Sequence, residues 1–367
     1  MGYLGFREIY INRCIELAKQ ALGSVAPNPM VGAVAVYKDN IIGEGFHRRF
    51  GGDHAEVTAI ESVRHQSLLK DSELYVNLEP CSHKGKTPPC AELIVKKKIP
   101  KVIIGTPDPN TLVAGKGIQF LRQNGVCILT GINEKSCIEL NKRFFTYHVH
   151  HRPYVILKWA QTRDGFIDVI RKPGLSVAPN WISNELSRVL VHKWRSEEQA
   201  IMIGTNTVKF DDPMLNTREW YGNNPLRIIL DRNLSLTKDF QIFKSEIKTL
   251  IINEKKSFKD KNFEFLRIKF TENLIQEIMH ELFGRNIQSI IIEGGKMLIE
   301  SFINANLWDE ARIFIGNKEF HQGIQAPVIN RTSDNIITIE NDQLIIHRNS
   351  DNYMPSIIKY LKKVKIA

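Results

Sequence analysis

Three side chains that can bind a metal, far apart in the sequence, constrain the fold of this chain more than any other feature. His54 stands in the motif His54-Ala55-Glu56, and Cys81 and Cys90 lie in the stretch that begins at Glu79. One imidazole and two thiolates make a three-ligand zinc site, and a catalytic zinc ion keeps its fourth position for water. We therefore expect a fold that brings residue 54 next to residues 81 and 90.

Glu56 is the expected proton carrier of this site. It follows His54 by two positions, so its carboxylate can reach the water but lies too near the same turn to be a convenient fourth ligand. Zinc nucleobase deaminases share the signature His-x-Glu followed by Pro-Cys-x-x-Cys. The chain has the first half and Pro80-Cys81, but its second cysteine is Cys90. Because these separate elements occur in register, ordinary buried thiols and a core histidine are the weaker interpretation.

Residues 82–89, between the cysteines, are polar and basic and end in two prolines. This composition favours a loop. We expect the loop to lie over a substrate, with His83, Lys84 and Lys86 meeting its phosphate or its ring.

Length and composition restrict the class of protein. At 367 residues the chain is long enough for about two domains. It has 43% hydrophobic residues, and no apolar run approaches the ~20 residues of a membrane helix. Five cysteines, two of them assigned to metal, predict a reducing compartment, and no signal peptide is visible, so a cytoplasmic location is expected. The net charge of +10 fits nucleic acid, a solvated basic surface or small phosphorylated ligands.

The first half alternates between strand and helix patterns. A hairpin of residues 33–37 and 41–46 is followed by a βαβαβ pattern to residue 106, with helices beginning at His54 and Cys90. This order predicts a mostly parallel sheet, with both ligand-bearing segments on one edge. A helix is expected over residues 134–147. The polar segment 148–153 is interpreted as a solvated linker, although its three histidines also suggest a second metal site.

The second half reads as another α/β domain, which gives domains at 1–147 and 153–367. Buried strands are expected at 154–160, 200–204, 226–231, 249–253, 289–293 and 310–315, and helices at 184–194, 272–283 and 296–305. The strand–turn–helix around Glu293-Gly294-Gly295 would let a backbone without Cβ atoms approach a phosphate. Taken alone, it also fits a tight turn without a ligand.

Several motifs resemble those of the bifunctional riboflavin-biosynthesis deaminase–reductase family, nearly from end to end. The deaminase motifs are Pro27–Gly32, His54–Val57, Glu79–Cys90, Asp108–Asn110 and Ala114–Gly117. The reductase motifs are Leu157–Ala160, Asp164-Gly165, Trp181-Ile182, Gly204–Thr207, Asp211–Pro213, Leu215–Arg218, Arg227–Asp231 and Glu293–Gly295.

The resemblance implies the fold and the reactions. The expected fold is α/β, with an N-terminal cytidine-deaminase-like three-layer domain and a C-terminal dihydrofolate-reductase-like domain. The first domain would use zinc to deaminate 2,5-diamino-6-(ribosylamino)-4(3H)-pyrimidinone 5′-phosphate hydrolytically. The second would use NADPH to reduce the ribosyl group to ribityl.

The resemblance also implies site residues. In the deaminase half these are Glu56 as the catalytic residue and His54, Cys81 and Cys90 as metal ligands. NADPH contacts are implied at Ala160, Trp181, Thr207, Asp211, Gly295, Lys296, Met297, Leu298, Ile299, Glu300 and Ser301. Substrate contacts are implied at Arg195, Leu215, Arg218 and Glu293.

The chain departs from the family pattern at three places. Lys86 replaces the usual arginine, and residues 178–180 before Trp181 replace a segment that contains serine. Arg232 follows Asp231 where serine is common, and would be placed to meet a cofactor phosphate.

Two alternatives stay open on the sequence. One is a nucleic-acid deaminase with a C-terminal binding domain, although the loop between the cysteines has no aromatic residue for base stacking. The other is a non-catalytic module stabilised by zinc. The expected partner is a small phosphorylated pyrimidine, without membrane or nucleic acid, and a homo-oligomer is compatible with the sequence.

Overall fold

The computed structural model describes residues 3–82, 88–111, 113–171, 178–352 and 357–361. The chain divides into two compact units, Met1–His151 with Met354–Ala367, and Arg152–Tyr353. The C-terminal segment thus groups with the first unit, whereas the expected second domain ran to residue 367. Its described part is helical, with Ile357 and Leu361 buried, and the Tyr360 hydroxyl donates to the Pro109 carbonyl at 3.1 Å.

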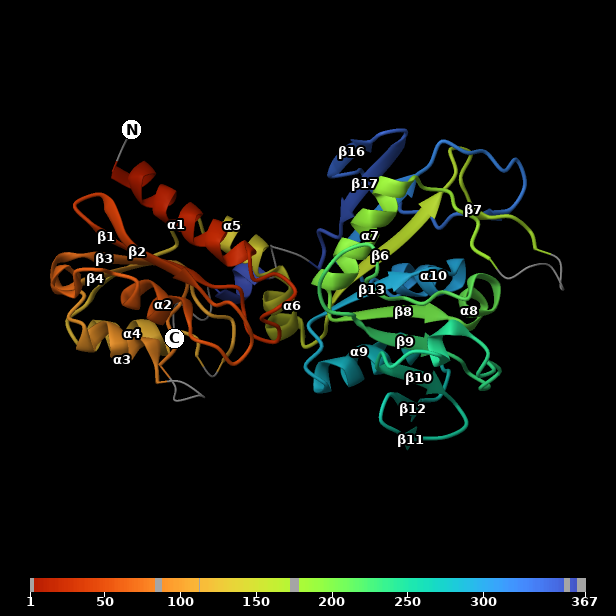
Figure 1. The fold of residues 1–367 in the computed structure, drawn as a ribbon, viewed down its shortest axis with the longest axis horizontal. Helices are drawn as coiled ribbons and strands as arrows, with labels where there is room; N and C mark the ends of the chain where they lie inside the picture. Colours follow the sequence, from red (N-terminus) through yellow and green to blue (C-terminus); the bar gives the residue numbers. More distant parts are fainter. Residues whose placement is uncertain (1–2, 83–87, 112, 172–177, 353–356, 362–367) are drawn as a thin grey trace. The chain divides into compact units, whose positions relative to one another are not determined.

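The first unit contains a five-stranded sheet in the order β2-β1-β3-β4-β5 (Figure 1). β1 pairs antiparallel with β2 and β3, whereas β3, β4 and β5 are parallel. The expected hairpin and mostly parallel sheet are confirmed. The strands are β1 (Gly32–Tyr37), β2 (Asn40–Phe46), β3 (Glu73–Leu78), β4 (Lys101–Thr106) and β5 (Cys127–Thr130).

Helices cover both faces of this sheet, which makes three layers (Figure 1). Successive strand side chains point to opposite faces. Ala33 and Ala35 therefore pack in one core and Val34 and Val36 in the other. One core is covered by α1 (Tyr3–Lys19) and α5 (Glu134–Leu140), and the other by α2 (Ala55–Glu61), α3 (Cys90–Lys96) and α4 (Lys116–Gln123), with the short helix η1 (Gln66–Asp71).

The helix expected over residues 134–147 is two helices, because Asn141 interrupts it. This buried side chain accepts from the Met30 amide at 2.7 Å and donates to the Met30 carbonyl at 2.8 Å. The second helix, α6 (Lys142–His150), contains three of the residues expected in a solvated linker, residues 148–150. The ring of His148 packs edge-on against Phe144, with centroids 4.4 Å apart. The linker interpretation was therefore wrong for this part of the segment.

The second unit contains a ten-stranded sheet in the order β11-β12-β10-β9-β8-β13-β6-β14-β17-β16. The pairs from β12 to β14 are parallel, and both edges are antiparallel. The strands are β6 (Tyr154–Gln161), β8 (Ala200–Gly204), β9 (Leu226–Leu230), β10 (Thr249–Asn253), β11 (Phe258–Lys259), β12 (Phe263–Arg267), β13 (Ser289–Glu293), β14 (Glu310–Ile315), β16 (Asn335–Ile339) and β17 (Asp342–Arg348), beside a separate pair of β7 (Phe166–Asp168) and β15 (Ile324–Gln325).

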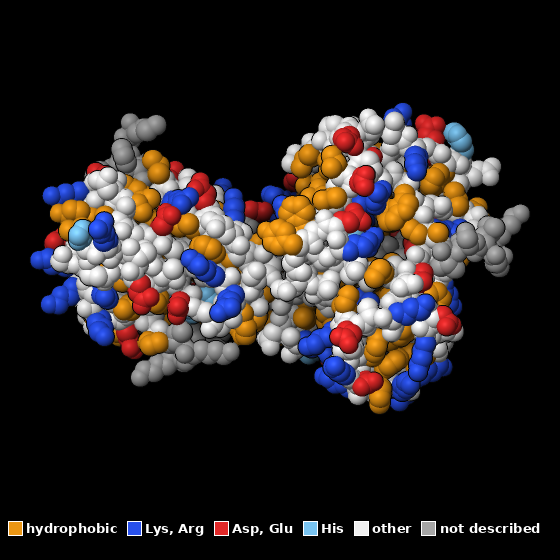
Figure 2. Space-filling view, viewed as in Figure 1, with side chains coloured by type: hydrophobic (Ala, Val, Ile, Leu, Met, Phe, Trp, Pro, Cys, Tyr) orange, Lys and Arg blue, Asp and Glu red, His pale blue; other side chains and the backbone are white. Residues whose placement is uncertain are grey.

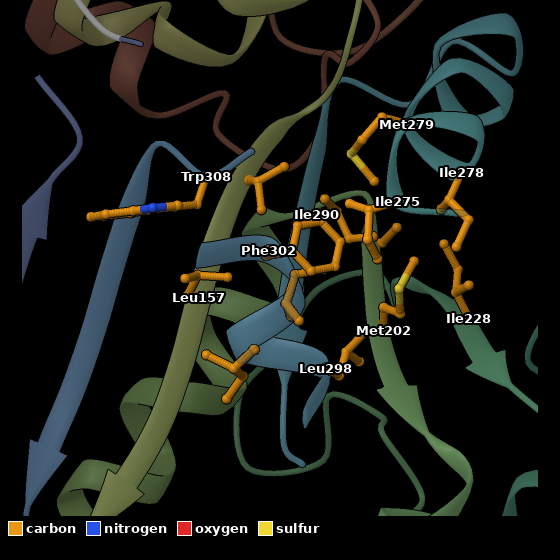
Figure 3. Close-up of a cluster of buried hydrophobic side chains, with 14 of the residues drawn as sticks. Leu157, Met202, Ile228, Ile275, Ile278, Met279, Ile290, Leu298, Phe302 and Trp308 are labelled. Atoms are coloured by element: carbon orange, nitrogen blue, oxygen red, sulfur yellow. The ribbon is translucent and has the colours of Figure 1, made fainter. Parts of the chain in front are cut away.

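The central strands of the second unit are buried on both faces, which explains their continuous apolar runs. On one face, α9 (Leu274–Gly284) and α10 (Lys296–Asn304) pack against the sheet, and Figure 3 shows Phe302 of α10 beside Ile290 of β13. On the other face, Trp194 of α7 (Glu185–Glu197) packs against Phe314 with centroids 5.5 Å apart. The remaining helices are α8 (Thr205–Asp211) and η2 (Gln241–Phe243).

A buried ion pair holds the start of the second unit, and we expect its loss to be costly. Both Arg152 terminal nitrogens donate to Asp309 at 2.6 and 2.7 Å, and Asp309 also accepts from the Val155 amide. Asp309→Ala leaves a buried guanidinium without its carboxylate, so the free energy of unfolding should fall by ~3–5 kcal/mol. The five tryptophans all lie in residues 159–308, so urea unfolding followed by tryptophan fluorescence reports on this unit.

The control for this prediction is the exposed pair Arg331–Asp351. Asp351→Ala should change the free energy of unfolding by less than ~1 kcal/mol, because water already solvates both charges. Equal losses in the two variants would contradict the prediction.

Candidate functional sites

Three ligand atoms meet at the edge of the first unit's sheet. His54 precedes α2, Cys90 begins α3, and Cys81 follows β3. The His54 Nδ1 atom lies 3.5 Å from Cys81 Sγ and 3.3 Å from Cys90 Sγ, and all three atoms lie within 4.8 Å of one another. Tetrahedral zinc, with bonds of ~2.3 Å to sulfur and ~2.0 Å to nitrogen, would separate nitrogen from sulfur by about 3.5 Å. The residues fit a zinc ion, and the described residues contain no other group of this kind.

The electrostatics of the thiols favour a bound cation. A hydrogen bond from Cys90 and the nearby His54 lower the pKa of Cys81 to about 4, against the effect of burial. The hydrogen bond with Cys81 and burial raise the pKa of Cys90 well above its usual value. A thiolate is the form that binds metal, so a cation between the two sulfurs would offset the cost of ionising both.

Glu56 lies in the first turn of α2 and is buried beside the same group. Burial, and then the charge of Cys81, raise the pKa of its carboxyl to about 7. A carboxyl group in this position can take up a proton and release it again.

His47 and Asn28 were not among the expected site residues, although Asn28 stands in one of the quoted motifs. The His47 ring lies 5.5 Å from the His54 ring between centroids. Its Nδ1 atom is 2.8 Å from the Asp53 carbonyl, so it donates there, and Nε2 accepts from the Asn28 amide at 3.0 Å. Neither the composition nor the periodicity around His47 indicates that its ring lies beside His54 and accepts from Asn28.

Glu79 connects the first cysteine to the next loop along the sheet edge. Its carboxylate accepts from the amides of Asp108, Gly115 and Ile118 at 3.0–3.2 Å. A Cβ atom at Gly117 would lie 2.0 Å from the Pro80 carbonyl oxygen, so only glycine fits. These contacts fix the backbone that leads to Cys81. The expected substrate contacts of His83, Lys84 and Lys86 lie outside the described residues.

The second unit holds a buried charged cluster on its sheet. Glu293, 14% exposed, ends β13 and pairs with Lys158 Nζ at 2.9 Å and Arg195 Nη2 at 2.9 Å. Burial would raise the Glu293 pKa, but the two cations outweigh it and lower the value to about 2. Arg195 and Glu293 were expected substrate residues. Lys158 was not among the expected substrate residues, although a single charged residue within an apolar strand can be recognised in the sequence.

The other two expected substrate residues lie in a segment that Arg195 also contacts. The Arg195 Nη1 atom donates to the Asn216 carbonyl at 3.3 Å. Leu215, with a φ of 53°, is buried, whereas the Arg218 side chain is 40% exposed. Leu215 therefore supports the segment, and Arg218 presents a cation.

The expected cofactor turn joins β13 to α10. Gly294 and Gly295 have φ values of 87° and 77°, and a Cβ atom at Gly294 would lie 3.0 Å from Thr207 Cγ2. This backbone cradle, at a helix N-terminus, fits a phosphate of a dinucleotide. In α10, Leu298 and Ile299 are buried in the core and their amides donate to the Gly295 carbonyl. Lys296 pairs with Glu300, Met297 is 79% exposed, and Ser301 donates to the Met297 carbonyl.

The remaining expected cofactor residues lie apart from that turn in sequence. Asp211 pairs with Arg171 at 2.9 Å, and Trp181 is half-exposed, with the Arg188 guanidinium 4.8 Å from its ring centroid. Ala160 lies near the end of β6, opposite Phe314 of β14. Arg232 pairs with Glu254 at 2.8 Å.

Comparison with known proteins gives two family matches. Residues 6–106 match the cytidine and deoxycytidylate deaminase zinc-binding region, and residues 153–319 match the RibD C-terminal domain. The chain is 39% identical to riboflavin biosynthesis protein RibD of Synechocystis sp. over 87% of this chain and 86% of the relative. It is 36% identical to RibD of Aquifex aeolicus over 86% and 88%.

Solved structures agree with these matches. A Thermotoga maritima diaminohydroxyphosphoribosylaminopyrimidine deaminase/5-amino-6-(5-phosphoribosylamino)uracil reductase has a TM-score of 0.85 and 35% identity, covering 95% of this chain and 99% of that one. Acinetobacter baumannii RibD has a TM-score of 0.83 and 31% identity, covering 94% and 98%. The expected combination of a deaminase-like unit and a reductase-like unit is confirmed.

Removal of one thiol should release the metal. Cys90→Ser replaces a buried sulfur ligand, and zinc affinity should fall by more than the ~10–100-fold typical of changes to outer-shell partners. Competition with a chromogenic chelator measures the affinity. Cys127→Ser, which changes an exposed cysteine, should retain the parent affinity. Retention of tight zinc binding by Cys90→Ser would exclude Cys90 as a ligand.

The ionised Glu293 carboxylate should stabilise the second unit at pH values above the ordinary pKa of a glutamate. Because folding lowers this pKa from 4.5 to about 2, the stabilisation is complete above about pH 4.5 and is lost as the pH falls towards 2. A shift of this size corresponds to about 3 kcal/mol. Tryptophan-monitored urea unfolding between pH 6 and 2.5 should show this extra loss in the parent but not in Glu293→Gln. The exposed control Glu246→Gln should follow the parent, and a parent-like profile for Glu293→Gln would refute the assignment.

Proposed function

The chain belongs to the RibD family of riboflavin-biosynthesis enzymes, and from this premise we propose which residues carry out its two reactions. The protein is a zinc-dependent deaminase and NADPH-dependent reductase, with the deaminase domain in the N-terminal half and the reductase domain in the C-terminal half. The observation that carries the residue assignment is the meeting of His54, Cys81 and Cys90 beside Glu56.

In the deaminase unit, His54, Cys81 and Cys90 hold the zinc ion. Zinc supplies hydroxide near neutral pH by lowering the pKa of a water molecule. Glu56 would take one proton of that water and give it to the ring nitrogen as the oxygen bonds to the ring carbon. It would then move the second proton of the water to the amino group, so that ammonia leaves and the oxygen stays on the ring carbon as a carbonyl. His47 fixes the amide of Asn28 as a donor, which leaves the Asn28 oxygen as an acceptor for a ring N–H.

In the reductase unit, the Gly294-Gly295 turn and the start of α10 receive the cofactor phosphates. NADPH supplies the hydride that converts the ribosyl group to ribityl. Glu293 orients Lys158 and Arg195, and Lys158 Nζ carries a proton at this site. Arg218 meets the phosphate of the substrate, since its guanidinium remains partly exposed.

The partners follow from this assignment. The substrate is a small phosphorylated pyrimidine, and the family match does not favour the nucleic-acid deaminase alternative. Figure 2 shows lysine and arginine interspersed with acidic, apolar and uncharged side chains on the visible face. Within the described residues, no helix has the length and apolar character needed to span a membrane. The cytoplasmic location and the homo-oligomer stay predictions.

Glu56→Gln should separate the two activities. Because glutamine cannot carry the proton, ammonia release should fall by ~10²–10⁴-fold, while bound zinc is retained. NADPH oxidation with the already deaminated intermediate should continue at the parent rate. Ammonia assays, zinc analysis and absorbance at 340 nm, the last a conventional wavelength for NADPH, measure these properties.

The matched control is Glu61→Gln, which changes an exposed glutamate at the end of the same helix. It should retain both activities. Ammonia release by Glu56→Gln at the parent rate would remove the proposed role of Glu56.

A further inference from the structure

A buried histidine on α7 is not among the residues assigned above to the two reactions. His192 is only 3% exposed and lies three residues before Arg195, on the same helix face. Its Nδ1 atom accepts from the Arg218 backbone amide at 3.3 Å. An amide can only donate, so Nδ1 is unprotonated and the imidazole is neutral, with its proton on Nε2.

The two side chains together hold one short stretch of main chain. Arg195 donates to the Asn216 carbonyl, and His192 accepts from the Arg218 amide. The peptide groups on both sides of Thr217 are therefore fixed to α7. Thr217 itself donates from its amide to Asn224 Oδ1 at 2.8 Å, which closes the loop.

The same loop returns to α7 one helical turn later. Gly222 has a φ of 129°, and a Cβ atom there would lie 2.8 Å from Ser196 Cβ. Ser196 follows His192 by four residues, so the loop runs along one side of the helix. The backbone path of the loop depends on contacts with α7 at both ends.

The charges around His192 keep it neutral. Burial, followed by the guanidinium groups of Arg195 and Arg218, lowers its pKa to about 4. The Glu219 carboxylate, 3.6 Å from Nε2, and the Asn216 carbonyl favour protonation but do not outweigh these effects. The acceptor at Nδ1 is thus present throughout the neutral range.

The side chain that this contact directs belongs to the charged cluster. Burial lowers the pKa of Arg218 and the neighbouring Glu219 carboxylate raises it. More distant charges act too, because Arg195 lowers this pKa and Glu293 raises it. Its Nη1 atom donates to Asn216 Oδ1 at 3.2 Å, within the same fixed stretch. The direction of the guanidinium therefore follows from the position of the main chain at residues 216–218.

We propose that His192 is a positioning residue for the reduction: its Nδ1 atom fixes the main chain at Arg218 and so aims the Arg218 guanidinium at the phosphate of the substrate. This inference rests on the proposed role of Arg218. It predicts that substrate binding needs a hydrogen-bond acceptor at the position of Nδ1, whereas a polar atom at the position of Nε2 contributes little to substrate binding.

Three substitutions separate this role from simple packing. Asparagine places an oxygen near the position of Nδ1, glutamine places its amide near Nε2, and leucine fills space without an acceptor. The KM for the deaminated ribosylamino intermediate should rise about tenfold in His192→Gln and His192→Leu, as expected for the loss of one ordering hydrogen bond. His192→Asn should stay within threefold of the parent. The kcat, the KM for NADPH and ammonia release should stay within twofold in all three.

If His192 only fills space, the three variants should rank in the opposite order, according to their stability. Asparagine leaves the largest cavity, so His192→Asn should then be the least stable variant and the most impaired. Thermal unfolding followed by tryptophan fluorescence supplies this comparison. The control His280→Asn changes an exposed histidine on α9 and should match the parent in every readout.

Arg218→Ala distinguishes failure of the inference from failure of the proposed function. A KM for the intermediate that rises at least tenfold in Arg218→Ala supports the proposed role of Arg218. If the His192 variants then keep the parent KM, or lose activity in proportion to stability, the inference is overturned while the function stands. If Arg218→Ala keeps the parent KM, the role of Arg218 fails and the inference fails with it.

Discussion

Parallel strands end along a common edge of their sheet, and both candidate sites of this protein depend on that constraint. In the first unit, β3 leads to Glu79 and Cys81, and β4 leads to Asp108, whose amide Glu79 binds. In the second unit, β13 ends at Glu293, which stands opposite Lys158 of β6. Hydrogen bonds between the strands fix the backbone at these positions, so the reactive side chains start from rigid supports.

The two units stabilise their charged groups in different ways. The first unit buries Glu56 on α2 and offers two thiols and an imidazole to a metal, so that a cation would balance the buried negative charge. The second unit pairs Glu293 with two cations of its own chain. Arg195 makes two kinds of contact, because it pairs with Glu293 and also holds the main chain that carries Arg218. A displacement of the loop after α8 can therefore affect the charged cluster through Arg195 of α7.

Much of the fold followed from periodicity, because the central strands are continuous apolar runs and the helices have one apolar face. The expected sheet of the first unit and the strands 200–204 and 289–293 were confirmed. The edge strand β16 and its neighbour β17 were not predicted. β16 is mostly exposed, and its isoleucines do not alternate regularly with polar residues. The break at Asn141 was also not predicted, because its cause is a contact with Met30, far away in the sequence.

The sequence by itself determined the chemistry available to this protein. His54, Cys81 and Cys90 stand out as candidate metal ligands and Glu56 as a candidate proton carrier, because metal binding and proton transfer need particular atoms and few other residues provide them. Only the tertiary structure decided which charges meet. Lys158 joins Glu293, His47 holds Asn28, and His192 holds the main chain at Arg218. These partners come from different strands, helices and loops, and their distances depend on packing that no local pattern of residues records.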